Sequence, residues 1–481
     1  MSSSRRSRFT WPQARLALSP LCVAMVLAGC AHTRSVEPVA VQAPPAAFKE
    51  VDGRWTPAVP AEAQPRGEWW KTFGDSQLND LIARADANNT SIQLAAARLK
   101  QARAIARATD ANRLPQVSVG AGAGRETSNP LTGTTAPGTL YTLGASASYE
   151  PDLFSRLSKA SDAAALDTQS REALVQSTRL LVQSDTAQAY FGLRALDAER
   201  ALVRQTVVAY RDTLKLTERR YAAGDVAELD LARVRTEVAF TESQAISLDR
   251  RRATLEHALA VLLGEPPSAL RVDEIEWAGQ VPQVPAGVPS TMLARRPDVA
   301  AAQRAMMAAQ VRVGIAQTAW FPDFSLTASG GLASTDIGDL FKWSARAWGI
   351  GALLSLPVFD GGRRDANLQN SNATWDAAAA SYREQVLVAF RDVEDQLSEL
   401  RLLTDQATAQ AQAVESASRA AVLSTSRYRN GYVSQLELLD ARRSELANRR
   451  QALQVRAAQY QATVGLIRAL GGSWGETASQ G

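Results

Sequence analysis

The sequence predicts a mainly α-helical chain with paired strands, built from two copies of one structural repeat. Three observations lead to this fold class. One pattern occurs twice at a fixed offset, two very long segments contain no proline, and short stretches of alternating polar and apolar residues stand between the helical segments. Length alone would suggest about two to four domains, but an internal repeat is the stronger guide to architecture.

The duplicated pattern is RYAAGDVAELDLARVR at residues 220–235 and RYRNGYVSQLELLDAR at residues 427–442. The same offset of 207 residues relates Pro115 to Pro322 and other landmarks along the chain. Agreement at several separate points is the signature of a structural duplication. Each copy should therefore run in the order helix, strand, strand, long helix, tip, helix.

The long helices are predicted at residues 155–222 and 362–429, which contain no proline and many alanines. At ~1.5 Å per residue each would be far longer than an average globular helix. Apolar residues repeat every seven positions, which predicts coiled-coil-like seams. One such series is Val386, Val393, Leu400, Ala407, Val414, Ala421 and Tyr428. A glycine in each tip, Gly224 or Gly431, suits a helix end with a left-handed backbone.

The strands are predicted from a period of two in VSVGAGA, YTLGASASY, FSLTAS and WGIGALLSL. Tyr141 and Tyr149 lie on the same face and would be ~26 Å apart, close to the apolar band of an outer-membrane barrel. A soluble sandwich with one buried face would show the same alternation. The strand pattern by itself leaves both interpretations open.

The N-terminal residues resemble an export signal. Four arginines precede the apolar run LALSPLCVAMVLAG, which is too short for a permanent membrane span. The run ends in LAGC, which resembles the bacterial lipobox and implies cleavage before Cys30 and acylation of this residue. A plain secretory signal, with Cys30 incidental, is the alternative.

Cysteine content and charge exclude some classes of protein. Cys22 lies in the segment to be removed, so the mature chain has no pair of cysteines for a disulfide. The four signal-peptide arginines account for the whole formal charge of +4, and the remaining chain is about neutral. A neutral chain has no electrostatic footprint for nucleic acid.

The sequence offers little material for catalysis or metal binding. GGSWG, at residues 471–475, fits the hydrolase pattern G-x-S-x-G, but it follows a helical segment where the motif needs a strand before Ser473. The two histidines, His32 and His257, are far apart in the sequence, and no cysteine cluster exists. We therefore expect no enzyme activity, no catalytic residue, no metal site and no cofactor other than lipid on Cys30.

Two acidic residues follow the second tip. Glu437 and Asp440 are three residues apart, so a helix places them on nearly one face. They would form an ordinary solvated face if Asp440 pairs with an arginine such as Arg443. In the first repeat the matching positions hold Asp230 and Arg233, which could pair with each other.

The duplicated order of elements, the two RYxxGxVxxLxL tips and the closing LGGSW resemble the TolC-type outer-membrane factor family. Together with LAGC they resemble its lipoprotein branch, the outer-membrane components of tripartite RND-type efflux systems. The resemblance implies a homotrimer whose chains each give four strands to one 12-stranded membrane β-barrel, with the long helices forming a periplasmic α-barrel. The resemblance also implies that the protein is located in the outer membrane of a Gram-negative bacterium, where lipid anchors the chain.

The resemblance also implies partners and site residues. A periplasmic adaptor (membrane fusion) protein would meet the tips and couple them to an inner-membrane RND-type transporter, which energises export of small molecules such as drugs. Glu437 and Asp440 match positions that line the constricted periplasmic gate, although Glu437 is longer than the aspartate common there. The expected docking residues are Arg220, Tyr221, Gly224, Val226, Arg427, Tyr428, Gly431 and Val433.

The expected segments are a signal peptide, a lipidated tether, two outer-membrane-factor repeats joined by a linker, and a tail. Their ranges are 1–29, 30–65, 66–270, 271–289 for the linker, 290–475 and 476–481. Two rival functions remain open on sequence alone. The same fold could serve as the exit duct of a type I protein-secretion system, and the chain could instead be a non-conducting envelope scaffold lipoprotein.

Overall fold

The structure is a computed structural model of the chain. It describes residues 48–50, 67–126, 138–275, 277, 279–282, 284 and 295–472. All of these lie in one compact unit, Ala43–Gly481. The predicted signal peptide, Cys30, Ser473 and the tail 476–481 fall outside the described residues.

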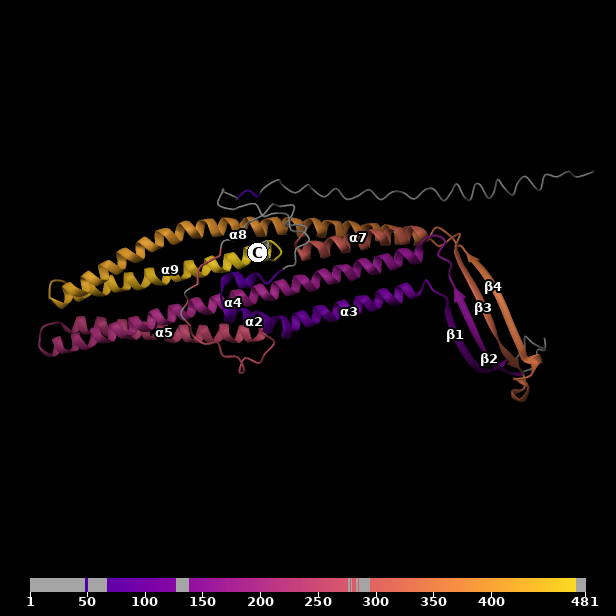
Figure 1. Cartoon of the computed structure of the whole chain (residues 1–481), viewed down its shortest axis with the longest axis horizontal. Helices are drawn as coiled ribbons and strands as arrows, with labels where there is room; N and C mark the ends of the chain where they lie inside the picture. The colour runs from indigo at the N-terminus through magenta and orange to yellow at the C-terminus, as the bar shows by residue number, and fades with distance from the viewer. Residues whose placement is uncertain are drawn as a thin grey trace, which may run out of the picture. The chain divides into compact units, whose positions relative to one another are not determined.

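The described elements alternate between helices and strand pairs (Figure 1). In the first half they are η1 (Trp69–Phe73), α2 (Ser76–Asn88), α3 (Thr90–Ala111), β1 (Gln116–Glu126), β2 (Gly138–Tyr149), α4 (Arg156–Ala222) and α5 (Glu228–Leu262). In the second half they are α7 (Pro297–Thr318), β3 (Asp323–Ser334), η2 (Ile337–Asp339), η3 (Trp343–Ala345), β4 (Arg346–Ser355), α8 (Arg363–Arg429) and α9 (Gln435–Ala469).

The two-repeat prediction is confirmed at the level of the helices. α3, α4 and α5 each begin and end 207 residues before α7, α8 and α9. The two long helices, α4 and α8, each have 67 residues, as the absence of proline predicted. Each turns back into a helix of 35 residues. We call α4 with α5 the first hairpin, and α8 with α9 the second hairpin.

The four strands form one antiparallel sheet in the order β1-β2-β3-β4. The period-two pattern sets the register, which pairs Val117 with Ala147 and Ser118 with Ser146, whose hydroxyls are 2.8 Å apart. Val117 is 71% exposed, so a single chain leaves its apolar strand residues uncovered. Among the described residues no strand pairs with the outer edge of β1 or of β4.

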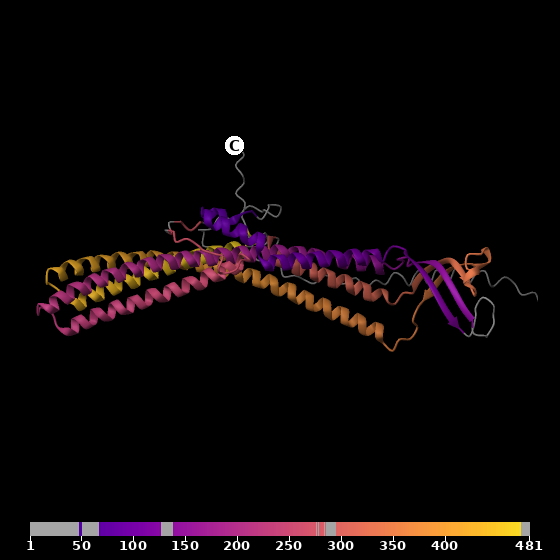
Figure 2. The same ribbon diagram turned by 90° about the horizontal axis from the view of Figure 1, so that it is seen from below.

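The helices form a layer whose neighbours change along its length. Near the strands α4 lies between α3 and α7, and toward the tips it contacts α5 and α9. Figures 1 and 2 show the sheet at one end of the long helices and the hairpin tips at the other. Among the described residues, no helix is both long enough and apolar enough to cross a bilayer.

The main core lies at mid-height, where η1 and α2 pack against the long helices. Phe191 of α4 contacts Phe73 and Tyr460 with ring centroids 4.8 and 4.6 Å apart. Aromatic groups bury large apolar areas and dominate such a core. Residues 48–50 also lie here: Phe48 is buried in the core, and the backbone amides of Lys49 and Glu50 donate to the Glu394 carboxylate at 2.7 and 3.0 Å.

Candidate functional site at the hairpin tips

The two tips have the same turn. Gly224 and Gly431 have φ of 81° and 79°, a left-handed conformation that glycine adopts without a Cβ clash. The Gly224 amide donates to the Tyr221 carbonyl at 3.0 Å, and the next amide donates to the Arg220 carbonyl at 2.8 Å. Corresponding bonds of 3.1 and 2.9 Å close the second tip. This is the Schellman pattern, so the RYxxG sequence encodes a helix end.

The tyrosines of the two tips lie in different surroundings. The Tyr428 ring is buried, at 4% exposure, and the Arg220 guanidinium lies over it at 4.9 Å from the ring centroid. Tyr221, its repeat mate, is 43% exposed. Arg427 is also exposed. The first tip therefore presents a free tyrosine in a single chain, whereas the second tip's tyrosine packs against the first hairpin.

The predicted gate residues lie in the first two turns of α9. Glu437 is exposed, and its backbone amide donates a hydrogen bond to the Ser434 hydroxyl at 3.2 Å, which caps the helix. Asp440 is exposed and pairs with Arg443 at 3.4 Å. Both carboxylates lie within the first two turns of α9. The Asp440–Arg443 pair also fits the solvated-face interpretation, so a gate role stays a prediction.

In the first repeat the mates of these residues behave as expected. Asp230 and Arg233 form an ion pair at 3.6 Å. Val226 and Val433 are each half-buried beside their tips. The structure thus gathers the predicted docking residues at two turns of one shape, with different charges just beyond them.

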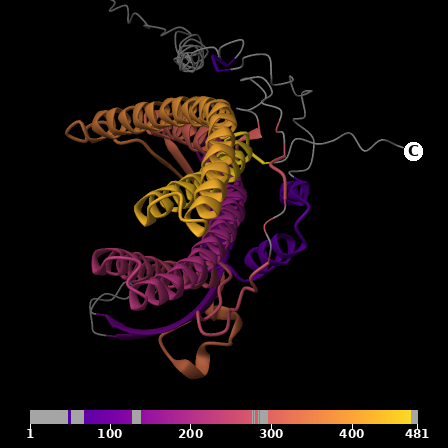
Figure 3. The ribbon, with the colours of Figure 1, turned by 90° about the vertical axis from the view of Figure 1, so that its left-hand side faces the viewer.

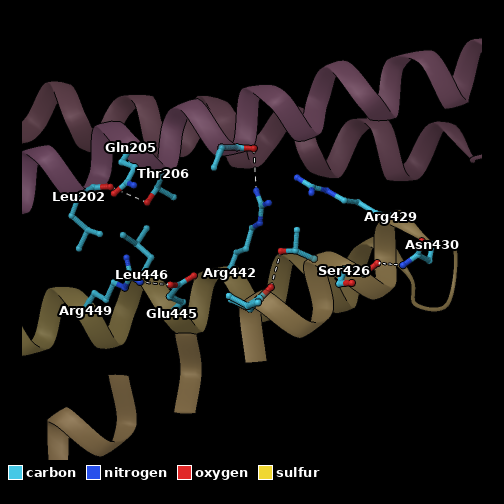
Figure 4. A pocket seen from close by; sticks show the side chains of 14 residues that line it. Leu202, Gln205, Thr206, Ser426, Arg429, Asn430, Arg442, Glu445, Leu446 and Arg449 are labelled. Atoms are coloured by element: carbon cyan, nitrogen blue, oxygen red, sulfur yellow. Dashed lines mark hydrogen bonds and ion pairs between the residues drawn. The ribbon is translucent and has the colours of Figure 1, made fainter. Parts of the chain in front are cut away.

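Arg442, which precedes Arg443 on α9, contacts the first hairpin and not the predicted gate carboxylates. Its guanidinium donates to the Ala209 carbonyl of α4 at 3.0 Å (Figure 4). It also donates to the Thr213 hydroxyl of α4 at 3.0 Å. Burial lowers the pKa of Arg442 because its charged form loses hydration. The residue lines a groove of about 600 Å³ between α4, α8 and α9. Arg442 therefore joins two hairpins and does not balance Glu437 or Asp440.

Several polar side chains of α9, Arg442 among them, contact the first hairpin, and the sequence analysis did not predict these contacts. Gln435 donates to the Thr217 hydroxyl of α4 at 3.0 Å. Arg443 also pairs with the buried carboxylate of Glu237 in α5. Arg450 pairs with Glu199 of α4 at 2.6 Å. The sequence does contain a signal for two of these contacts, which is a difference between the repeats. Arg443 and Arg450 correspond to Thr236 and Ser243 in the first repeat, so the arginines are specific to the second hairpin. Figure 3 shows the two hairpins side by side from this end.

The site has no catalytic constellation in the part of the chain that is described. No group of three or more His, Cys, Asp or Glu residues there could hold a metal ion. Gly471 and Gly472 follow α9, a helix, where the hydrolase motif would need a strand. His257 lies within α5, far in sequence from any serine or cysteine motif.

A comparison with known families matches the outer membrane efflux protein profile twice, over residues 81–265 and 288–472. The chain belongs to the outer membrane efflux protein family. The two matches are themselves 207 residues apart and together cover most of the two repeats.

Individual relatives agree over almost the whole chain. The cation efflux system protein CusC of Escherichia coli (strain K12) is 32% identical over 459 residues, which are 95% of this chain and 99% of the relative. The pyoverdine export outer membrane protein OpmQ of Pseudomonas aeruginosa is 32% identical over 470 residues, which are 95% of this chain and 97% of the relative. The solvent efflux pump outer membrane protein SrpC of Pseudomonas putida is 31% identical over 464 residues, with 95% and 98% covered.

Solved structures share the fold. The outer-membrane channel OprN superposes with a TM-score of 0.83 at 30% identity, covering 91% of this chain and 99% of the other. VceC of Vibrio cholerae gives a TM-score of 0.79 at 28% identity, covering 85% and 99%. The chain is thus an outer-membrane efflux channel protein with a periplasmic helical tunnel, and it is not an enzyme.

Proposed function

We propose that three copies of this chain close one continuous exit duct for small molecules. The observation that carries this proposal is the four-stranded sheet, whose two outer edges pair with no other strand in the part of the chain that is described. In a bilayer each unpaired backbone group costs several kcal/mol, so a membrane sheet must close on itself. Three copies supply 12 strands, and each chain's β4 then pairs with β1 of its neighbour.

The same assembly gives the helices their purpose. Each chain contributes two hairpins, so six hairpins surround the periplasmic end. The tips are the most distant part of the helices from the sheet (Figure 1). We assign their repeated residues to docking of a periplasmic adaptor protein, which couples the duct to an inner-membrane RND-type transporter. An acylated Cys30 anchors each chain to the outer membrane.

The exported compounds are set by the pump, and the duct selects little. This part of the proposal is supported by the relatives, which are named for the efflux of cations, the export of pyoverdine and the efflux of solvents, and are about equally similar to this chain. Such different cargoes share no single binding chemistry. The described residues likewise hold no enclosed cluster of metal ligands that would bind one cation.

Glu437 and Asp440 form the periplasmic gate in this proposal. Threefold symmetry brings three copies of each to the narrow end, and the six carboxylates should attract cations and be blocked by multivalent ones. Glu437→Ala with Asp440→Ala is therefore expected to weaken cation preference and multivalent block in single-channel recordings of purified protein, without loss of the trimer.

A matched control comes from the first repeat. Asp230→Ala with Arg233→Ala changes the equivalent helix positions and removes an ion pair without net charge. It should leave cation preference and block as in the parent. Selectivity and block that are unchanged in the Glu437 and Asp440 variant would return these carboxylates to an ordinary solvated helix face.

A further inference from the structure

A groove of about 810 Å³ lies where α4 runs between α3 and α7, and residues of all three helices line it. Small side chains leave this space open, among them Ala102, Ala164 and Ala305. Two larger apolar side chains also line the groove, Ile105 at 55% exposure and Leu174 at 37% exposure. The groove is therefore partly apolar, and we call it the arginine groove for the charges that follow.

The arginine groove carries more positive than negative charge. Arg98 of α3, Arg171 of α4 and Arg312 of α7 line it, together with one acidic residue, Asp167 of α4. Arg312 pairs with Asp167. In the part of the chain that the structure describes, no carboxylate pairs with Arg98 or Arg171, and both are exposed. Two guanidinium groups are thus available to an anion in the groove.

The groove opens on the face of the helical layer that points away from α2. On the α2 side, Arg179 of α4 lies 3.9 Å from a carboxylate of α2, and Arg103 of α3 pairs with Glu172 of α4 at 2.6 Å. At ~100° per residue, Arg98 lies about 140° around α3 from Arg103, and Asp167 lies about 140° around α4 from Glu172. Figure 3 shows α2 on the convex side of the curved layer. In the proposed duct the groove therefore faces the tunnel.

The charges of the groove are not needed to form its helices. At an offset of 207 residues, the positions of the three arginines and the aspartate correspond to neutral residues. These are Ala305 for Arg98, Thr374 for Asp167, Ala378 for Arg171 and Ile105 for Arg312. The helices α7 and α8 still have the same lengths as α3 and α4. The four charged side chains are therefore specific to this groove, and folding of the repeat does not explain them.

We propose that the arginine groove binds amphipathic organic anions on the wall of the tunnel, with one site in each chain. This inference rests on the proposed duct and names a class of small molecule that the wall holds during passage. Arg98 and Arg171 bind the carboxylate, sulfonate or phosphate group, because the planar guanidinium fork matches such oxygens with charge-assisted hydrogen bonds. Ile105 and Leu174 contact the apolar part of the molecule.

The site binds weakly and reversibly. Its arginines are exposed to water and salt, which screen their charges. Weak binding suits a duct, since a molecule that is held tightly at one site cannot leave it quickly. The pump still chooses the exported compound, and the groove only concentrates those compounds that carry a negative charge and an apolar body.

A fluorescent anion tests the site. The probe is dansylate, a naphthalene sulfonate, titrated with the full-length protein in nanodiscs of phosphatidylcholine, with empty nanodiscs as the blank. Its emission should report saturable binding of one molecule per chain. Arg98→Gln with Arg171→Gln should weaken this binding at least about tenfold, because two charge-assisted hydrogen bonds are lost. Dansylamide, which has the same rings without the charge, should bind weakly to the parent and to the variant.

A matched control removes two positive charges from the same two helices on the α2 side. Arg103→Gln with Arg179→Gln should leave dansylate affinity within about twofold of the parent, because both side chains lie outside the groove. Equal losses in the two double variants, or a parent that conducts in planar bilayers but binds no dansylate, would overturn this inference and leave the proposed duct intact. A parent that does not conduct would overturn the duct on which the inference rests.

Asp167 supplies a test in the opposite direction. Asp167→Asn removes the one carboxylate of the groove and frees the Arg312 guanidinium. Dansylate should then bind more tightly than it does to the parent, and the gain should shrink as salt is added. Weaker or unchanged binding would contradict an anion site in this groove, since loss of a nearby negative charge must favour an anion.

Discussion

At the scale of single residues, Gly224 and Gly264 each follow the last turn of a helix, α4 and α5, but they have different surroundings. Both have positive φ, 81° and 70°. A Cβ at Gly264 would lie 2.3 Å from the Asn88 carbonyl oxygen, whereas a Cβ at Gly224 meets nothing within 4 Å. An alanine would meet backbone strain at either position, and a steric clash only at position 264.

Gly224→Ala should therefore cost roughly 1–2 kcal/mol of stability, from the left-handed backbone alone. Gly264→Ala should cost more because the junction of α2 with the end of α5 must move. Melting temperatures of the two purified variants, followed by circular dichroism, measure the difference. Equal shifts for the two variants would mean that the contact at Asn88 relaxes freely.

Arg296 lies at the start of α7 and joins two carboxylates, Asp298 at 2.6 Å and Asp392 at 3.1 Å. Burial would raise the pKa of Asp298, but the hydrogen bond and charge of Arg296 outweigh it and hold this pKa below 3.8, its ordinary value. The carboxylate is ionised more easily in the folded chain than in the unfolded one. Its contribution to stability is thus present above 3.8 and is lost as the pH falls through the lowered pKa.

Asp298→Asn should remove this part of the pH dependence. The parent should lose melting temperature more steeply than the variant as the pH falls below 3.8. Asp395→Asn, which changes an exposed carboxylate on α8 three residues after Asp392, is the control and should follow the parent. A variant at Asp298 with the parent's acid sensitivity would show that other carboxylates control acid unfolding.

At the scale of elements, α9 is held to the first hairpin by arginines. Arg450 pairs with Glu199, whose side chain is 7% exposed, while the neighbouring Arg449 pairs with Glu445, which is 23% exposed. Removing one partner of a fully buried pair leaves an uncompensated charge and costs about 3–5 kcal/mol, whereas an exposed pair is worth about 0–1 kcal/mol. The Arg450–Glu199 pair lies between these limits because the Arg450 side chain is 28% exposed.

Arg450→Gln should accordingly lower the melting temperature of the helical part clearly more than Arg449→Gln does. Thermal unfolding of both variants in the same detergent is the measurement. A larger loss for Arg449→Gln would contradict the role of the pair between α9 and α4 in holding the two hairpins together.

The sequence was informative about elements for physical reasons that can be named. Absence of proline allowed helices of 67 residues, and glycine at positions 224 and 431 set their ends. The contacts between elements were harder to predict. Arg442 could be placed on α9 from the sequence, but its choice of the Ala209 carbonyl over the nearby carboxylates depends on how α9 lies against α4. Such contacts depend on the packing of distant segments, which periodicity along one helix does not encode.

At the scale of the whole molecule, duplication explains why one chain carries two near-equivalent hairpins. Hairpins of the same shape can line one ring with nearly regular spacing. Side chains that differ between the two hairpins can form a gate in that ring. Glu437 and Asp440 together carry two negative charges, whereas the matching pair Asp230 and Arg233 is neutral because Arg233 stands where Asp440 stands in the second repeat; this divergence was visible in the sequence. That these carboxylates face the axis of an assembly could not be predicted from one chain, because an axis exists only when several chains are present.

The central claim is that this chain forms a conducting duct and is not a scaffold. The most direct measurement is ion conductance of the purified protein in planar lipid bilayers, together with its oligomeric mass by native mass spectrometry. The account predicts discrete single-channel currents from a species with the mass of three chains. A well-folded trimer that never conducts, or currents from a monomer alone, would contradict it.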